Sequence, residues 1–325
     1  MSHPIEIAEK IKKGDVPSLA RAITLVESKN PYKRKLGSQI LRILASSGHK
    51  SSRIGITGIP GAGKSTLIES IGLDLIRRGE KVAVLSIDPS STLSGGSILG
   101  DKTRMPRLSA HPNSFIRPSP NQNIFGGLGP HTFETIFLCE AAGYSYILME
   151  TVGTGQSESE IAFITDMLIL VNVAGQGDDL QGIKRGVMEL SDLLVINKTD
   201  EPEDTNVLSA VQFLTQAIKL LPERPHKIPV SILTVSSYRP ETITLLTDKI
   251  EEFIKTIRNE GYLETSRALK IKNVFIQYIK NMHWHMLESK KEVSQAIDYS
   301  IAELVSKPYT IYELTESLLS KISKC

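Results

Sequence analysis

Short apolar runs alternate with longer stretches of helical periodicity across the middle of the chain. The runs are nearly continuous in Val, Ile, Leu and Met, which is typical of strands that helices cover on both faces. Their alternation with helical segments predicts strand–helix units and a mostly parallel central sheet flanked by helices. We expect strands at 53–57, 82–87, 146–150, 167–173, 193–196 and 230–235, and helices near 64–78, 132–142, 179–191, 204–221 and 240–258.

Helical sequence flanks this central α/β domain, which we place at 51–260. Residues 1–50 predict an N-terminal helical extension. Residues 261–325 predict a C-terminal helical arm with an apolar stripe that would pack on its own domain or on a second subunit. The stripe consists of Phe275, Tyr278, Ile279, Met282 and Met286.

Two further segments stand out by composition. The stretch between Asp88 and His131 is rich in Gly, Pro and Ser, and we expect a long functional loop there. The basic cluster 33–35 is expected to be a solvated helix face, with contact to an acidic partner as the alternative.

Composition narrows the class of protein. The 325 residues carry 38 basic and 36 acidic side chains, a net charge of +2 that is small for a nucleic-acid-coating protein. The two cysteines, Cys139 and Cys325, offer neither a disulfide framework nor a Cys-rich metal site. No apolar run reaches the roughly 18 residues of a membrane helix, and residues 1–15 contain no apolar core of the kind that a secretory signal has. We therefore expect a cytoplasmic protein whose partners are neither nucleic acid nor membrane.

A glycine-rich loop follows the first predicted strand. Residues 58–66 match the phosphate-binding pattern G-x-x-x-x-G-K-[ST] directly before a predicted helix. Its glycines let backbone N–H groups turn toward phosphates, Lys64 adds a positive charge, and Ser65 offers a hydroxyl to Mg²⁺. The predicted phosphate site comprises Gly58, Ile59, Pro60, Gly61, Ala62, Gly63, Lys64, Ser65 and Thr66.

Two carboxylates end predicted strands. Asp88 follows the strand at 82–87, and Glu150 ends the strand at 146–150. Because ligands gather at the carboxyl ends of parallel strands, both residues are expected on the phosphate edge, where Mg²⁺ takes oxygen ligands. A single acidic residue at a strand end is more often a helix cap, but two on one edge favour a magnesium site.

The strand at 193–196 runs into the sequence Asn-Lys-Thr-Asp, which matches the N-K-x-D guanine signature. The Asp200 carboxylate can accept hydrogen bonds from guanine N1–H and the exocyclic amine, two donors that adenine does not present there. A site built for such donors can reject their absence by about 10⁴-fold. The expected base-binding residues are Asn197, Lys198 and Asp200, with support from Ser236, Ser237 and Tyr238 after the last strand.

The segment after Glu150 is typical of a γ-phosphate sensor. A backbone N–H at Gly153 can contact the γ-phosphate and release it after hydrolysis. Thr154 follows directly, where fast GTPases carry a water-orienting Gln, and Gln156 is the nearest candidate for that task. We therefore expect slow intrinsic hydrolysis that a partner accelerates.

With these motifs the chain resembles the GTPases associated with methylmalonyl-CoA mutase, the MeaB/ArgK family. The resemblance implies a P-loop NTPase fold and a homodimeric G-protein chaperone, with GTP/GDP and Mg²⁺, for an adenosylcobalamin-dependent acyl-CoA mutase. In that family GTP binding and hydrolysis gate cofactor loading, protect the mutase and help to exchange damaged cofactor. The segments that carry the resemblance are GIPGAGKST (58–66), DPSSTLSGGSILGDKTRM (88–105), ETVGTGQSE (150–158), GDDLQGIKRG (177–186) and NKTD (197–200).

The resemblance also assigns roles that the patterns alone do not. It implies that Asp88, Asp101 and Glu150 are the magnesium and switch carboxylates, with Ser65 as a direct ligand. It further implies that segment 177–186 is an additional switch, in which Asp178 and Lys184 take part in signalling to the mutase. The expected catalytic set is Lys64, Asp101, Glu150, Gly153 and Gln156.

Three other functions fit parts of the pattern. A kinase could use the same phosphate loop, although the guanine signature argues against an ATP-dependent one. A metallochaperone GTPase of the nickel-delivery type would need a Cys- or His-rich tract, which the two cysteines and seven scattered histidines do not supply. A non-hydrolysing scaffold that binds a partner through its helical tail is the third alternative.

Overall fold

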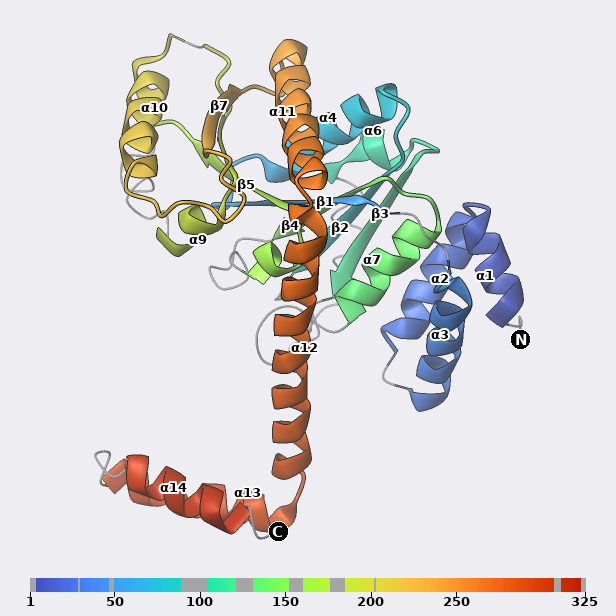
Figure 1. Cartoon of the computed structure of the whole chain (residues 1–325), viewed down its shortest axis with the longest axis vertical. Helices are drawn as coiled ribbons and strands as arrows, with labels where there is room; N and C mark the ends of the chain where they lie inside the picture. Colours follow the sequence, from blue (N-terminus) through green and yellow to red (C-terminus); the bar gives the residue numbers. More distant parts are fainter. Residues whose placement is uncertain are drawn as a thin grey trace. The chain divides into compact units, whose positions relative to one another are not determined.

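The computed structural model describes residues 4–28, 30–46, 50–88, 104–120, 131–151, 160–175, 185–201, 203–306 and 311–322. Within these ranges a seven-stranded parallel sheet forms the centre, in the order β3-β2-β4-β1-β5-β6-β7 (Figure 1). This α/β sheet confirms the predicted fold class. Its strands are β1 (Ser52–Gly58), β2 (Val82–Asp88), β3 (Ser114–Pro120), β4 (Tyr146–Thr151), β5 (Met167–Val173), β6 (Leu193–Asn197) and β7 (Ser231–Val235).

Helices cover both faces of the sheet because its central strands are apolar on both sides. Along β5, Ile169 belongs to the core shared with α4 and α11, whereas Leu168 and Leu170 point to the other face. The first face carries α4 (Lys64–Arg77), α6 (Pro106–Ser109) and α11 (Pro240–Asn259). The second face carries α1 (Pro4–Lys12), α2 (Val16–Val26), α3 (Pro31–Leu44), α7 (His131–Ala141), η1 (Glu160–Phe163), α9 (Arg185–Leu190) and α10 (Thr205–Ile218).

The prediction of one long loop between Asp88 and His131 is wrong for residues 106–109 and 114–120. Residues 114–120 form β3, which pairs with β2 from end to end, and α6 precedes it. The strand was hidden in the sequence because Pro118 and Pro120 interrupt it. Proline lacks the N–H of a ladder hydrogen bond, but β3 is an edge strand with one neighbour, where proline is tolerated.

One residue of the basic cluster at the start of α3 departs from the expected solvated face. The Arg34 guanidinium forms a two-pronged ion pair with Glu134 of α7, at 2.8 and 2.6 Å, and also donates to the carbonyl oxygen of Val26. Lys33 and Lys35 are exposed on either side of it. Arg34 therefore fastens the N-terminal helices to the sheet domain instead of facing solvent.

The chain divides into two compact units, Met1–Lys270 and Ile271–Cys325. The boundaries that we predicted at 50 and 260 stay a proposal. Within the described residues, no helix combines the length and apolarity that a membrane crossing requires. The helices beyond residue 261 are α12 (Tyr262–Glu288), α13 (Lys291–Ser306) and α14 (Ile311–Ile322).

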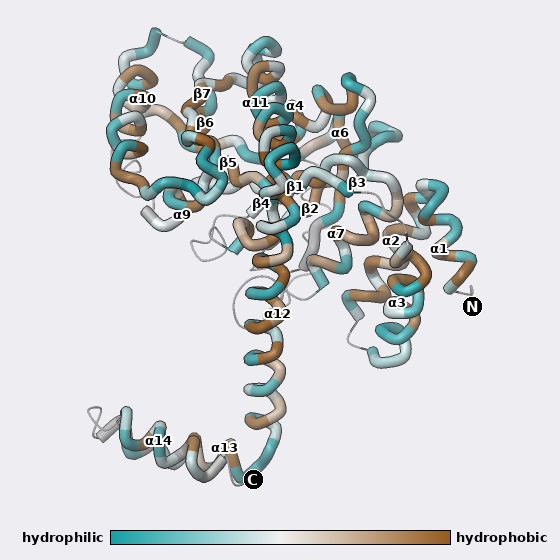
Figure 2. The backbone as a smooth tube through the Cα atoms, viewed as in Figure 1, coloured by the Kyte–Doolittle hydropathy of each residue, from teal (hydrophilic) through white to brown (hydrophobic). Residues whose placement is uncertain are grey.

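The predicted apolar stripe lies on α12, where hydrophobic positions recur along the helix (Figure 2). Phe275 is 61% exposed and Met286 is 64% exposed, and Ile279 and Met282 are also open. Tyr278 is half-buried. An apolar stripe of this kind is a candidate interface.

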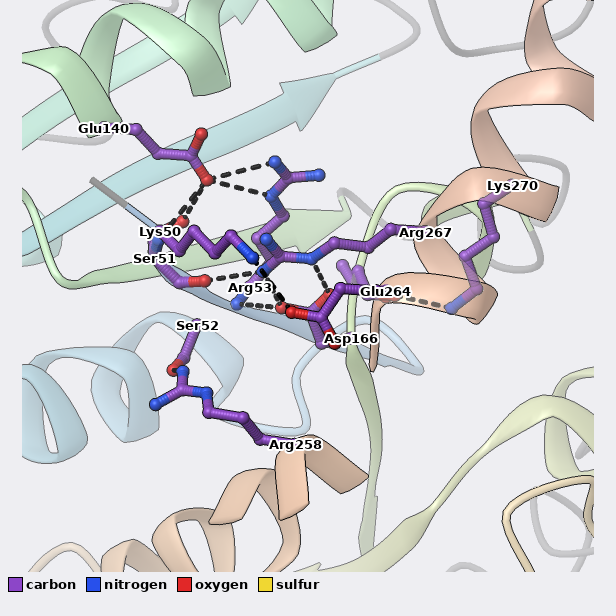
Figure 3. A network of polar contacts seen from close by, with 11 residues as sticks. Lys50, Ser51, Ser52, Arg53, Glu140, Asp166, Arg258, Glu264, Arg267 and Lys270 are labelled. Atoms are coloured by element: carbon purple, nitrogen blue, oxygen red, sulfur yellow. Dashed lines mark hydrogen bonds and ion pairs between the residues drawn. The ribbon is translucent and has the colours of Figure 1, made fainter. Parts of the chain in front are cut away.

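A buried polar network joins the start of α12 to the amino ends of β1 and β5 (Figure 3). Arg267 donates to both carboxylate oxygens of Asp166, at 2.7 and 2.5 Å, and to the carbonyl oxygen of Ser51. Asp166 also accepts the backbone N–H of Arg53, whose side chain pairs with Glu140 at 3.0 Å. The network therefore holds the first turns of α12 against the amino ends of β1 and β5, whose carboxyl ends lie at the phosphate edge.

Candidate nucleotide-binding site

The phosphate loop begins at the carboxyl end of β1, a strand in the middle of the sheet. Gly58 has φ +144°, and a Cβ there would lie 2.1 Å from the carbonyl oxygen of Val171 on β5, so glycine is required. Gly61 and Gly63 have φ of +78° and +82°, and α4 begins directly after them at Lys64. The loop thus delivers the chain to a helix N-terminus, whose free N–H groups and dipole favour an anion.

Lys64 folds back over this loop. Its side chain is buried, and Nζ donates to the carbonyl oxygens of Gly58 at 2.8 Å and Ile59 at 3.0 Å. These contacts hold a positive charge at the loop, where phosphates would need it.

Ser65 and Glu150 meet at the same edge. Ser65 Oγ donates to Glu150 Oε1 at 2.9 Å, and Glu150 is 5% exposed. The carboxylate arrives there because β4 pairs with β1, with Glu150 opposite Ile56. Mg²⁺ is coordinated by hydroxyl and carboxylate oxygens together with the phosphate oxygens of a nucleotide, so the Ser65–Glu150 pair offers suitable ligands for the ion. The backbone of Asp88 ends β2 on the other side of β4.

The second predicted motif contacts the phosphate loop directly. Asn197 at the end of β6 is buried, and its Nδ2 donates to the carbonyl oxygen of Ala62 at 2.8 Å. A Cβ at Gly63 would lie 2.6 Å from that Nδ2. Lys198 follows with φ +61° and an exposed side chain. Asn197 therefore braces the two loops against each other.

A buried serine orients Asp200. The Ser236 hydroxyl donates to Asp200 Oδ1 and accepts the backbone N–H of Tyr238 at 3.1 Å. The backbone of Ser236 is held in turn by Thr242, whose Oγ1 accepts the Ser236 N–H at 3.1 Å and donates to its carbonyl oxygen at 3.0 Å. Asp200 itself is exposed, so its carboxylate is fixed in direction yet open to a donor pair.

The other predicted site residues fall into two groups. The remaining loop and base residues lie at the same edge: Ile59 and Ser237 are half-buried, and Pro60, Thr66 and Tyr238 are exposed. The second group lies outside the described residues, so its roles stay predictions: Asp101, Gly153, Gln156, Asp178 and Lys184.

Sequence reasoning missed two supporting contacts. Thr151 Oγ1 donates to Thr57 Oγ1 at 3.0 Å, and both threonines are fully buried at the ends of β4 and β1. This bond links the strand before the phosphate loop to the strand before Gly153. The second contact is that of Thr242, which holds the backbone of Ser236 through two hydrogen bonds. No motif marks either contact, because each depends on strand pairing and helix placement.

Comparison with known proteins agrees with this geometry. The chain is 47% identical over 262 residues to a probable GTPase of Mycobacterium tuberculosis, covering 80% of this chain and 78% of that protein. It is 43% identical over 262 residues to the GTPase ArgK of Escherichia coli, covering 81% and 79%.

A crystal structure named as an LAO/AO transport system kinase superposes with a TM-score of 0.80 at 30% identity, covering 98% of this chain and 97% of that one. The family model described as methylmalonyl Co-A mutase-associated GTPase MeaB matches residues 19–292. The Mycobacterium tuberculosis and Escherichia coli relatives are named GTPases, and the phosphate and guanine motifs of this chain come together in its structure. The chain therefore belongs to the MeaB family of methylmalonyl-CoA mutase-associated GTPases.

Proposed function

We propose that this GTPase is the chaperone of an adenosylcobalamin-dependent acyl-CoA mutase of the methylmalonyl-CoA mutase type. It gates cofactor loading and protects or reactivates the mutase. The observation that carries the proposal is the family match over residues 19–292, because that family is described by its association with this mutase. The guanine-specific signature and the site geometry supply the nucleotide chemistry that such a switch needs.

In this proposal the residues at the sheet edge bind and hydrolyse GTP. The Lys64 ammonium neutralises the β- and γ-phosphates, and the loop N–H groups hold their oxygens. Ser65 and Glu150, with Asp88 and Asp101, hold Mg²⁺, which supplies further charge neutralisation when bound. Gly153 senses the γ-phosphate.

Base selection and water positioning belong to neighbouring residues. Asp200 accepts the two guanine donors while Ser236 keeps its carboxylate in place. Lys198 lies along the base, and the loop at Ser237 and Tyr238 supports its edge. Gln156 orients the attacking water.

Partner contacts lie elsewhere on the chain. Asp178 and Lys184 take part in signalling to the mutase. The C-terminal arm makes a homodimer, because the exposed stripe on α12 offers an apolar surface for a second copy. The protein works in the cytoplasm.

The test is GTP hydrolysis by the purified chain, alone and with a methylmalonyl-CoA mutase. We expect turnover below about 1 s⁻¹ alone, a slow rate relative to typical enzymes, and a large rise with the mutase. Lys184→Ala should reduce that rise, whereas Lys219→Ala, which changes an exposed lysine at the end of α10, should preserve it. GTP turnover that is indifferent to the mutase would contradict the chaperone role and leave the GTPase activity standing.

A kinase is the second candidate, favoured by the name of the superposed structure. A kinase would transfer the γ-phosphate of GTP to a protein or metabolite. Incubation with γ-labelled GTP separates the two functions: a GTPase releases the label as inorganic phosphate, and a kinase deposits it on an acceptor.

A further inference from the structure

A hollow of about 670 Å³ lies on the outer side of α4. Figure 1 shows α4 flanked by α11 and α6, and all three contribute to its wall. Small-molecule sites typically measure about 300–1,000 Å³. Of the predicted nucleotide-site residues, Ser237 alone is among its described lining residues. The hollow is therefore separate from the phosphate loop and touches the base-recognition loop at one rim.

Positively charged and hydrogen-bond-donating side chains gather on its wall. Arg77 and Arg107 both line it, and among the described lining residues there is no carboxylate. Arg77 gives one hydrogen bond to Asp74 at 2.6 Å, and its side chain is 65% exposed, so most of its five N–H donors face outward. An anion entering the hollow would meet two guanidinium groups.

The second arginine is held in place by its backbone. The N–H groups of Arg107 and Leu108 both donate to the Glu69 carboxylate of α4, at 2.7 and 3.1 Å. Those N–H groups are thus already taken, and Arg107 is the residue of α6 among the described lining residues of the hollow. His111 adds a further donor, because its Nδ1 accepts the backbone N–H of Asn113 at 3.2 Å, which leaves Nε2–H to donate in the neutral ring.

The floor is apolar. Leu73 is half-buried, and Ile76 and Ile243 are almost fully buried beneath the same wall. A ligand that covers this floor must carry an apolar body as well as its charge, as most ligands of such sites do.

We propose that this hollow binds a small organic anion, an apolar body that carries a carboxylate or phosphate group, at a site separate from the phosphate loop. Arg77 and Arg107 grip the acidic group, which suits the planar fork of a guanidinium. The apolar body lies on Leu73, Ile76 and Ile243. Because the rim includes Ser237, next to the serine that orients Asp200, the bound anion sits where it can influence guanine binding.

The test uses the full chain saturated with GDP and Mg²⁺, so that the phosphate loop is not the site observed. The probe is 8-anilinonaphthalene-1-sulfonate, an aromatic anion whose fluorescence rises on binding, and N-phenyl-1-naphthylamine is its neutral counterpart. We expect saturable binding of the anionic probe and a Kd raised about tenfold or more by Arg107→Gln, since one charged hydrogen bond has that worth. Arg104→Gln is the matched control, because Arg104 is exposed three residues away and does not line the hollow.

Competition then identifies the acidic group. Benzoate and phenyl phosphate share an aromatic ring, and the one that displaces the probe at lower concentration names the preferred anion. The proposal is overturned if Arg107→Gln binds the anionic probe as tightly as the parent, or if the neutral probe loses as much affinity as the anionic one. Because Arg107 is exposed, its substitution leaves the fold intact, and circular dichroism verifies this.

Discussion

Replacing Asp200 by Asn tests base recognition at the level of single hydrogen bonds. The Asp200 carboxylate presents two acceptors, which match the N1–H and amine donors of guanine. In Asp200→Asn one oxygen becomes an NH₂ group. The Ser236 hydroxyl donates to Oδ1, so it keeps the amide oxygen on its own side and turns the NH₂ group toward the base edge. That group opposes the guanine amine.

The expected loss follows from the bonds involved. One charge-assisted hydrogen bond disappears and the other becomes neutral, a loss of about 3–5 kcal/mol when each charged bond contributes about 1.5–3 kcal/mol. GDP affinity should fall by roughly 10²- to 10⁴-fold. Xanthine carries a carbonyl where guanine carries its amine, so the Asn variant should bind XDP more tightly than GDP.

The assay is equilibrium competition of GDP and XDP against a fluorescent nucleotide. Asp204→Asn is the control, because Asp204 lies on the same loop and caps α10 by accepting the Asn206 N–H at 2.8 Å, a role that Asn fills equally well. Unchanged GDP affinity in Asp200→Asn would refute the reasoning. So would a loss of GDP binding with no gain for XDP, since Asp200 would then not face the base.

Three further changes have calculable outcomes. Gly58→Ala should lower the thermal midpoint and abolish GTP binding, because the new Cβ would lie 2.1 Å from the carbonyl oxygen of Val171; normal binding would contradict the loop geometry. Asp166→Asn should lower the free energy of unfolding by about 3–5 kcal/mol in urea titrations, since it removes the buried negative charge that Arg267 pairs with and sets an NH₂ group against one of its donors, and a loss under about 1 kcal/mol would mean that the pair is dispensable. Glu134→Gln should destabilise the chain by about 1–3 kcal/mol at pH 7. Burial raises the pKa of Glu134, but hydrogen bonds from His131 and Arg34 together outweigh it and keep that pKa below its ordinary 4.5. The stabilisation is therefore present above pH 4.5 and lost as the pH falls through the lowered pKa, so parent and variant should converge in acid; a constant difference would exclude this carboxylate as the cause.

The sheet and the two nucleotide loops could be predicted because their signals are local. A continuous apolar run marks a buried strand, and the residues that follow it must lie at the sheet edge. This logic predicts Glu150 at the phosphate edge, where it accepts a hydrogen bond from Ser65, and it predicts Asn197 at the end of its strand, where it contacts the phosphate loop. The Ser65–Glu150 contact requires that β1 and β4 be parallel and adjacent, whereas Asn197 reaches the phosphate loop from β6, which β5 separates from β1.

Features that depend on long-range packing could not be predicted in this way. β3 was not predicted because its prolines argue against a central strand. Proline is permitted in an edge strand, but which strand lies at the edge is known only once the strand order is known. Arg34 reads as a surface residue in sequence, and its ion pair with Glu134 follows from the docking of α3 on α7. The Thr57–Thr151 bond likewise depends on the register of β1 and β4.

The most direct test of the account is the ratio of kcat/KM for GTP to that for ATP in the unaltered chain with Mg²⁺. If Asp200, held by Ser236, selects the base as the geometry indicates, the ratio should reach about 10⁴. Comparable values for the two nucleotides would contradict the guanine site, and with it the identification of the hydrolysed substrate.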